Sequence, residues 1–524
     1  MALRDLVQKT AASVASVPSP IGGWNARDSI ANMDPVDAVQ LTNLFPNVNN
    51  VVLRGGYTNW ATGLPGQVQT LANYSTGTAN KLFAWAGTDI YDVTTTGVVG
   101  PAETTPVLTN AKWEYINVTT SGGSYLYCVN GTDAPLLYNN TTWESITGIS
   151  SPIAITGVTT TTLSNITLHK NRVWFIQKDT LKAWYLPTNA VGGAAVALDM
   201  SAIARLGGTL TDVSTWTIDA GHGVDDNLIF LSSKGEAIVW SGTDPSDPDA
   251  WALIGVWIVG EPIGNRCLLK YGGDILLLTM DGLVPLAGGL QSSRLDPQVN
   301  LSNKIQGAFD FAAINYRSSF GWQIYYSAKQ NAVWVNVPVS EGSQQQQYVM
   351  NNTTKSWCNF TGWEANCWET FSDDPYFGGD GVVGKAWTST YVDDVSNIET
   401  VSLQAFNYFD SRGVKKYWTR ARPSIFSDGQ PAIAIGMNVD FDVSDTTAAL
   451  SFSPTTVGLW DTGIWGPYAG NALWGAGLQI TNNWQGIAGF PGYCGSIQFK
   501  SSSSGIQIQW ASTDIVYQTG WAGI

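Results

Sequence analysis

The sequence predicts an all-β protein built around a β-propeller of six or seven blades. Three observations support this fold class. The composition, with 55 Gly, 24 Trp and only 13% charged residues, is typical of short strands joined by tight turns rather than of helices. Strand–turn–strand segments recur at a regular spacing. The residues before and after these segments differ from them in sequence pattern, which predicts an N-terminal arm with a short helix and a C-terminal β-rich region.

The N-terminal arm spans residues 1–66 and contains a predicted helix. The side chain of Asp34 can accept backbone N–H groups as an N-cap, and Pro35 suits the first helical position. The helix is therefore expected over residues 35–43. Pro46 lies beyond it and cannot donate a hydrogen bond to continue the ladder. The chain then becomes extended and leads into the propeller.

The propeller is predicted over residues 67–395 from a repeat of a strand, a polar turn and a second strand. Repeats of about 40 to 50 residues with four strands each indicate blades that stack around a closed ring. A further unit beginning at Pro375 gives a count of six or seven. The six repeats begin at positions 81, 124, 171, 227, 274 and 322.

The remaining residues, 396–524, are predicted to form a sandwich-like interaction region. They contain a run of five cations in an otherwise acidic chain. The run is either a solvated strand face or a contact for the acidic surface of a neighbouring subunit. Tryptophans in the tail either pack in a core or interface, or stack on sugar rings. The cations are Arg412, Lys415, Lys416, Arg420 and Arg422, and the tryptophans are Trp460, Trp465 and Trp474.

Charge and composition exclude several classes of function. The net charge is −15 at pH 7, which disfavours a protein that binds nucleic acid by neutralising phosphates. The chain has no apolar run of about 18 residues, so no membrane span is expected. Residues 1–20 lack the apolar centre of a signal peptide. Free buried thiols are favoured over disulfides, including for Cys358 and Cys367, because five scattered cysteines suit a reducing compartment.

Signatures of enzymes are absent from the sequence, and no catalytic residue, metal or cofactor is expected. The two histidines, His169 and His222, are interpreted as loop or face residues. Adjacent acids point to opposite faces of a strand, so a glycosidase pair would need partners from separate blades. The acids considered for such a pair are Asp225, Asp226, Asp373, Asp374, Asp393 and Asp394. A turn is favoured over a calcium loop at Asp244, Asp247 and Asp249.

Several short motifs occur near both ends of the chain. The N-terminal motifs are Gly22–Ser29, Met33–Ala38, Asn43–Pro46 and Leu53–Tyr57. The later ones are Phe406–Phe409, Lys415–Lys416, Arg422–Pro423, Val439–Phe441 and Thr513–Val516. Taken together, they resemble the motifs of tail tubular (nozzle or hub) proteins of short-tailed bacteriophages. The resemblance covers both ends of the chain, and the middle only through its repeat.

The resemblance implies a homohexameric ring in the virion tail, below the portal and adaptor proteins, assembled in the host cytoplasm. Such a ring would retain the viral DNA, let it pass at ejection without specific binding, and carry tail fibres. It brings no catalytic residues. A lumen of acidic or neutral groups would repel phosphates and let the DNA slide.

The alternative is a Trp-rich propeller that binds or cleaves carbohydrate. The two hypotheses differ in their expected oligomeric state and in their response to polysaccharides. For the tail protein, the expected interface residues are Trp24, Arg27, Arg54, Arg412, Lys415, Lys416, Arg420, Arg422, Trp460, Trp465 and Trp474.

Overall fold

The computed structural model describes residues 12–77, 79–103, 107–219, 224–291, 299–449, 479–481, 483–487 and 490–520. The chain folds into two compact units. The propeller unit comprises Asn59–Gln347 and Trp363–Ala386. The sandwich unit takes its described residues from Met1–Thr58, Tyr348–Gly362 and Trp387–Ile524.

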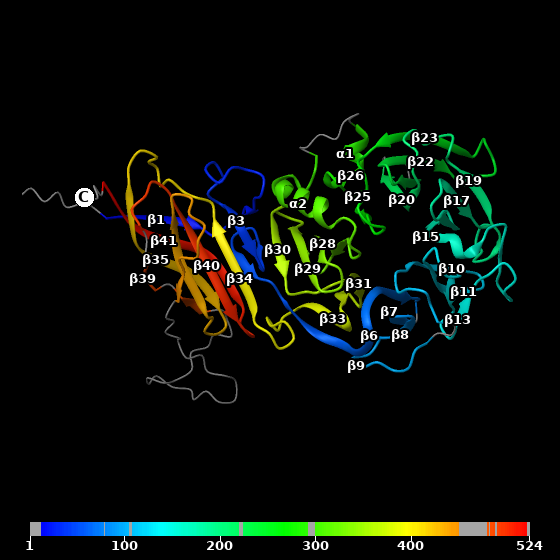
Figure 1. Ribbon diagram of the computed structural model, residues 1–524, viewed down its shortest axis with the longest axis horizontal. Coiled ribbons are helices and arrows are strands. Elements are labelled where there is room, and N and C mark those ends of the chain that lie inside the picture. Colours follow the sequence, from blue (N-terminus) through cyan, green and yellow to red (C-terminus); the bar gives the residue numbers. More distant parts are fainter. Residues whose placement is uncertain are drawn as a thin grey trace, which may run out of the picture. The chain divides into compact units, whose positions relative to one another are not determined.

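The propeller unit contains seven blades of antiparallel strands among its described residues, and the first and last blades share strand β6, which confirms the predicted fold. Figure 1 shows these sheets following one another around a ring. In chain order they are β6–β8 (Gly56–Ser75, Asn80–Ala86, Asp89–Asp92), β10–β13 (Glu114–Thr120, Gly123–Val129, Leu136–Tyr138, Trp143–Ser145), β15–β17 with β19 (Leu163–His169, Arg172–Gln177, Lys182–Tyr185, Val196–Asp199), β20–β23 (Leu210–Asp219, Val224–Ser232, Glu236–Gly242, Trp251–Ile258), β24–β26 (Leu268–Tyr271, Asp274–Thr279, Gly282–Pro285), β27–β29 (Gln323–Ser327, Ala332–Ser340, Gln344–Asn351) and β31–β33 (Cys367–Phe371, Asp374–Gly378, Asp380–Thr388).

The ring closes through the long strand β6. Its residues Val68–Ser75 pair with β7 in the first sheet, while β6 also neighbours β33 of the last sheet. One strand therefore belongs to both the first and the seventh blade, so the ends of the ring are joined by hydrogen bonds and two free sheet edges are removed.

Apolar side chains fill the spaces between consecutive sheets. Trp85 and Trp113 pack between the first and second sheets, and Tyr127 and Phe175 pack between the second and third. Trp174 then joins the cluster between the third and fourth. Several of the many tryptophans therefore lie between blades, where their large flat side chains cover the wide faces of the twisted sheets.

The predicted repeat corresponds to the buried apolar strands of the blades. Its first five starts fall on, or one residue before, the second strand of a blade, β7, β11, β16, β21 and β25, and the proposed extra unit falls on β32. The sixth start lies one residue before β27, the first strand of its blade. The count is therefore seven.

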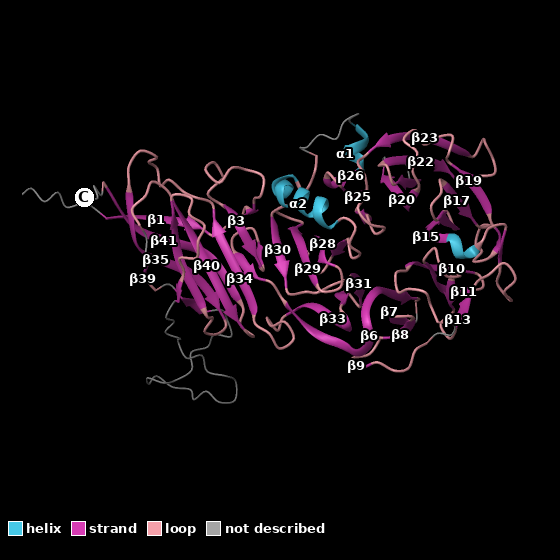
Figure 2. Ribbon diagram, in the orientation of Figure 1, coloured by secondary structure: helices cyan, strands magenta, loops and turns pink. Residues whose placement is uncertain are grey.

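Helices are few, as Figure 2 shows. Short helices α1 (Leu286–Gln291) and α2 (Gln306–Tyr316) follow the three strands of the fifth sheet. In the described part of the chain, no helix combines the length and the apolarity needed to cross a membrane. The remaining short elements are the 3-10 turns at Thr160–Thr162 and Asn303–Ile305 and the strands β9 (Gly97–Val98), β14 (Ile155–Thr156) and β18 (Gly193–Ala194).

The sandwich unit consists of two sheets built from both ends of the chain. The first has the order β38–β35–β41–β5–β4 (Gln479–Thr481, Lys416–Ser427, Ile508–Thr519, Val51–Leu53, Leu44–Pro46), with β1 (Ala12–Pro18) on β41 and β39 (Gln485–Gly486) on β35. The second runs β30–β3–β34–β40–β36–β37 (Trp357–Thr361, Asp37–Thr42, Ile398–Gln404, Gly495–Ser503, Ile433–Val439, Ala448–Ala449), with β2 (Gly23–Trp24) on β3.

Buried aromatic rings join the two sheets of the sandwich unit. Phe499 of β40 stacks on Trp510 of β41, with ring centroids 4.8 Å apart. Gly495 of β40 lies against the Trp418 ring of β35, where a Cβ would come within 2.9 Å of the indole. Buried residues largely alternate with partly exposed ones along β41.

The predicted helix over residues 35–43 is wrong. The Asp34 carboxylate does accept the N–H of Val36, and the Asp37 N–H donates to the Asp34 carbonyl, but these bonds close only a turn. The following residues form β3, with Ala38 and Leu41 buried against the sandwich core. Pairing with β34 along most of β3 outweighs the local capping signals.

Residues 12–58 do not form a separate arm. They supply β1 to β5 of the sandwich unit and pair with strands from the far end of the chain. Residues 348–362, which the sequence placed inside the propeller, also belong to this unit.

Candidate functional site

The innermost strands of the seven sheets surround a cavity of about 340 Å³ on the propeller axis. In three of these strands the pairing register shifts, as at a β-bulge, directly before a residue near the axis: before Thr70, Asn165 and Asp212. A bulge turns a side chain out of the regular alternation, and here it turns polar groups toward the axis. Each of the seven innermost strands contributes at least one side chain to the lining of the cavity. These lining residues include Leu71, Glu114, Asn165, Asp212, Leu268, Gln323 and Glu369.

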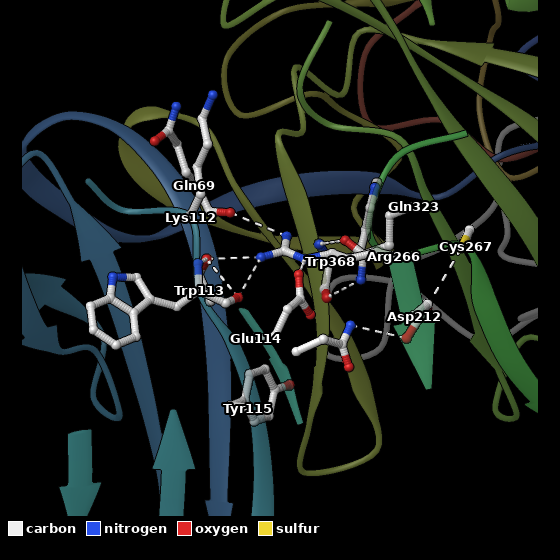
Figure 3. Close-up of polar contacts among 12 residues, drawn as sticks. Gln69, Lys112, Trp113, Glu114, Tyr115, Asp212, Arg266, Cys267, Gln323 and Trp368 are labelled. Atoms are coloured by element: carbon white, nitrogen blue, oxygen red, sulfur yellow. Dashed lines mark hydrogen bonds and ion pairs between the residues drawn. The ribbon is translucent and has the colours of Figure 1, made fainter. Parts of the chain in front are cut away.

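Arg266 ties together three inner strands at the axis, as Figure 3 shows. Its Nε donates to Glu114 Oε1 at 3.1 Å. Its two terminal nitrogens donate to the carbonyls of Gln69 and Trp113 and to the Thr70 hydroxyl, at 2.8 to 3.2 Å. The guanidinium is thus largely saturated by groups of its own chain.

The axial carboxyl groups are likewise engaged. Asp212 Oδ1 accepts from Asn165 Nδ2 at 3.0 Å, and Cys267 Sγ donates to Oδ2 at 3.6 Å. Burial raises the pKa of Asp212 to about 8, so this carboxyl group is mostly protonated at neutral pH. The Tyr115 hydroxyl donates to Glu369, whose pKa burial raises to about 7.

A second pair of hydrogen bonds connects two inner strands across the same cavity. The Gln323 side chain donates to the carbonyl of Trp368 and accepts its N–H, both at 2.9 Å. The Gln323 amide thereby makes hydrogen bonds to the backbone of β31 in place of backbone–backbone bonds between β27 and β31. The chemistry of the axis is therefore a closed polar network with two weakly acidic carboxyl groups.

Of the acids considered from the sequence for a glycosidase pair, none whose side chain the structure describes lines this cavity. Asp226 accepts from Thr217, and Asp374 is paired with Lys329 and Lys385. Asp373 and Asp394 have left-handed backbone conformations in loops or turns. His222 and the side chain of Asp225 lie outside the described residues.

The turn expected at Asp244 is confirmed. Its carboxylate accepts the N–H and hydroxyl of Ser246 and pairs with Arg172 at 3.1 Å. No group of three or more metal-ligating side chains occurs among the residues that the structure describes. His169 is buried, and burial lowers its pKa to about 4. All five cysteines are free and buried.

Arg54, proposed as an interface residue, is instead buried inside the sandwich unit. Its guanidinium pairs with Asp393, with Nη1–Oδ1 at 2.8 Å, and its Nε donates to Asn43 Oδ1 at 2.9 Å. The partner acid lies so far along the chain that sequence spacing gave no sign of it. Trp24 makes an edge contact with Tyr348, and Arg27 pairs with the adjacent Asp28.

The basic run divides into buried and exposed cations. Lys416 is fully buried, and its ammonium donates to the carbonyls of Ser411, Val414 and Tyr493. Its expected role as an interface cation is therefore wrong, because the charge is used to close the surrounding loops. Arg422 pairs with Asp514.

The other three cations of the run, Arg412, Lys415 and Arg420, are exposed. The proposed interface residues Trp460, Trp465 and Trp474 lie outside the described residues.

No protein-family model and no curated protein matches the chain. Solved structures resemble it at low similarity. A structure of "YCF48 bound to D1 peptide" has 13% identity and a TM-score of 0.37 over 67% of this chain and 98% of that one. BBS1N in complex with ARL6DN has 9% identity and a TM-score of 0.38 over 64% and 98%. A family 43 arabinoxylan arabinofuranohydrolase from Bacillus subtilis has 8% identity and a TM-score of 0.25 over 95% and 99%.

Proposed function

We propose that the chain is a structural protein of the tail of a short-tailed bacteriophage. In this proposal, copies of the chain form a hexameric ring below the portal and adaptor proteins. The ring retains the viral DNA, lets it pass at ejection and carries tail fibres. The protein is assembled in the host cytoplasm and acts in the virion without being an enzyme.

One observation carries the proposal: residues of the resembling N-terminal motifs join the two ends of the chain in the sandwich unit. Gly23 has a φ of +83°, and a Cβ there would lie 2.6 Å from the Trp357 carbonyl oxygen. A Cβ on Gly56 would clash with the Val392 backbone. Arg54 and Asn43 bind each other and the strand end at Thr361.

These contacts explain why the motifs need glycine at positions 23 and 56, asparagine at position 43 and arginine at position 54. The motif residues thus have a structural role, as expected for a protein whose work is assembly. The closed polar network on the propeller axis is compatible with this role, because its carboxyl groups are bonded to side chains of the same chain.

The rival function, a propeller that cleaves glycosides, is favoured by one observation. Asp212 and Glu369 lie on different inner strands of one cavity and have raised pKa values, as a general acid requires. This location differs from that of the acids selected from the sequence.

Two measurements on the full chain separate the proposals. Sedimentation velocity is expected to give a mass several times that of the 56.3 kDa chain, and a monomer at all concentrations would contradict the tail proposal. A panel of polysaccharides is expected to give no released sugar. Sugar release that disappears in both Asp212→Asn and Glu369→Gln would establish the glycosidase instead.

A further inference from the structure

We infer that the exposed cations of the basic run form a docking strip for the acidic surface of a second copy of this chain. This inference rests on the proposed function, because it assigns a surface to ring assembly. The strip is defined as Arg412, Lys415, Arg420 and Arg422 together with the aromatic residues beside them, Tyr408, Trp484, Phe490 and Tyr493.

The strip is continuous because the described residues 485–487 and Gly492 pair with β35. Arg420 pairs with Gly486 in the sheet register, and the Ile487 N–H donates to the Thr419 carbonyl. Lys416 and Gly492 then exchange backbone hydrogen bonds at 2.7 and 3.0 Å. The cations from residue 422 to residue 415, with the rings beside them, therefore follow one length of β35 and the residue before it, about 25 Å at roughly 3.3 Å per residue.

Three cations of the strip lie over aromatic rings. Arg412 lies 4.5 Å from the ring centroid of Tyr408, and Arg422 lies 4.7 Å from that of Trp484. The ammonium of Lys415 lies 5.7 Å from the centroid of Tyr493. A cation held over a ring loses less conformational freedom when it meets a partner, so the strip is partly ordered before binding.

Negative groups next to the strip are already occupied. Asp514 neutralises Arg422, and the Asp440 carboxylate accepts the N–H groups of Tyr493 and Cys494. Asp410 and Asp440 also act on the buried ammonium of Lys416. The charges left for a partner are therefore those of Arg412, Lys415 and Arg420.

The composition of the strip favours a protein partner. Tyrosine, tryptophan and arginine are the residue types that dominate binding energy at protein interfaces. Phe490 is 83% exposed and Tyr493 is 41% exposed, so apolar surface accompanies the charge. Three cations that have no ion pair with a described residue are few for a site that holds DNA through its phosphates.

A second copy of the chain is the partner that charge complementarity selects. Each copy has a net charge of −15, so its surface outside the strip is acidic. Contact between a basic strip on one copy and an acidic surface on the next is heterologous, and a heterologous contact that closes on itself produces a ring.

The test is a triple charge reversal in the full chain, Arg412→Glu, Lys415→Glu and Arg420→Glu. These side chains are exposed, so the fold is expected to survive, as circular dichroism and a thermal melt would check. Sedimentation velocity is expected to show association weakened about tenfold or more. Wild-type association is expected to weaken between about 50 mM and about 500 mM NaCl.

The matched control reverses three exposed cations away from the strip and changes the net charge by the same amount. It consists of Lys178→Glu, Arg317→Glu and Lys355→Glu. This variant is expected to associate like the wild type. Equal loss of association in both variants would overturn the inference, because net charge rather than the strip would then control association.

Two further outcomes would overturn the inference, and they differ from failure of the proposed function. If the wild type forms rings and the strip variant forms them equally well, only the strip is refuted. If the wild type binds a labelled DNA duplex and the strip variant loses that binding while its association is unchanged, the strip serves nucleic acid. A wild type that never associates refutes the tail proposal itself.

Discussion

The guanidinium of Arg54 and the carboxylate of Asp393 form a buried ion pair between positions 339 residues apart in the chain. Both residues belong to the sandwich unit, where Arg54 also donates to Asn43 and to the carbonyls of Gly55 and Thr361. The pair fastens the beginning of the chain to a segment that follows the propeller strands.

Replacing Arg54 with Met is expected to destabilise the sandwich unit by about 3–5 kcal/mol, because Asp393 is left charged, buried and unpaired. Denaturant unfolding followed by tryptophan fluorescence measures the loss. Adding Asp393→Asn is expected to recover part of it. The exposed control Arg27→Met should stay within about 0.5 kcal/mol of wild type, and an equal loss in both arginine variants would contradict this role for Arg54.

Lys416→Met is expected to cost about 3 kcal/mol in the same assay, because it removes the donor that satisfies three carbonyl groups. Lys415→Met changes the neighbouring exposed cation and is the matched control, expected to change stability by less than about 0.5 kcal/mol. Comparable unfolding midpoints for the two variants would show that the Lys416 ammonium is not a structural cation.

Asp212 predicts a pH dependence of stability. Burial raises its pKa to about 8 in the folded chain, against about 3.9 for an exposed aspartate. Between about pH 4 and pH 8 the folded state therefore keeps the Asp212 proton, while the unfolded state has lost it. The contribution of this group to the free energy of unfolding is complete below about pH 4 and is lost as the pH rises through about 8. The slope from this group reaches about 1.4 kcal/mol per pH unit.

Asp212→Asn keeps the shape of the side chain and removes this titration. Unfolding free energies measured from pH 5 to pH 8 are expected to fall less steeply for the variant than for the wild type. Glu369 contributes a slope of the same sign in both proteins. Parallel pH profiles would mean that Asp212 does not titrate as its burial implies.

Deletion of residues 1–30 removes β1 and β2 from the sandwich unit. Backbone amides in the paired part of β41, from Ser512 to Gln518, are expected to exchange hydrogen faster, while β7 and β11 in the same sample keep their protection. The truncated chain is also expected to assemble less well. Ring formation at the wild-type level would show that residues 1–30 are not needed for assembly.

The sequence predicted the blades because each repeat contains a buried apolar strand, and a run such as Ile275–Leu278 is visible without any structure. It did not reveal the axial site. Glu114, Asp212 and Glu369 are single acids on separate strands, and only closure of the ring brings them to one cavity. The signal available in the sequence was that each of these three acids lies on the strand before the apolar strand of its blade.

Local signals failed where distant strands decide the structure. The cap at Asp34 predicted a helix, but pairing with β34 makes the following residues a strand. Arg54 was expected at an interface because its partner Asp393 lies 339 residues further along the chain. By contrast, because side chains of a strand point alternately to its two faces, the sequence could have predicted that Lys415 is exposed and Lys416 is buried.

The central claim is that copies of the chain form a ring. Class averages of the purified full chain by electron microscopy test it most directly, since they report symmetry without any assumption about ligand or partner. The proposal predicts closed rings with six-fold symmetry and an open centre. Single particles the size of one chain, or dimers without a central opening, would contradict it.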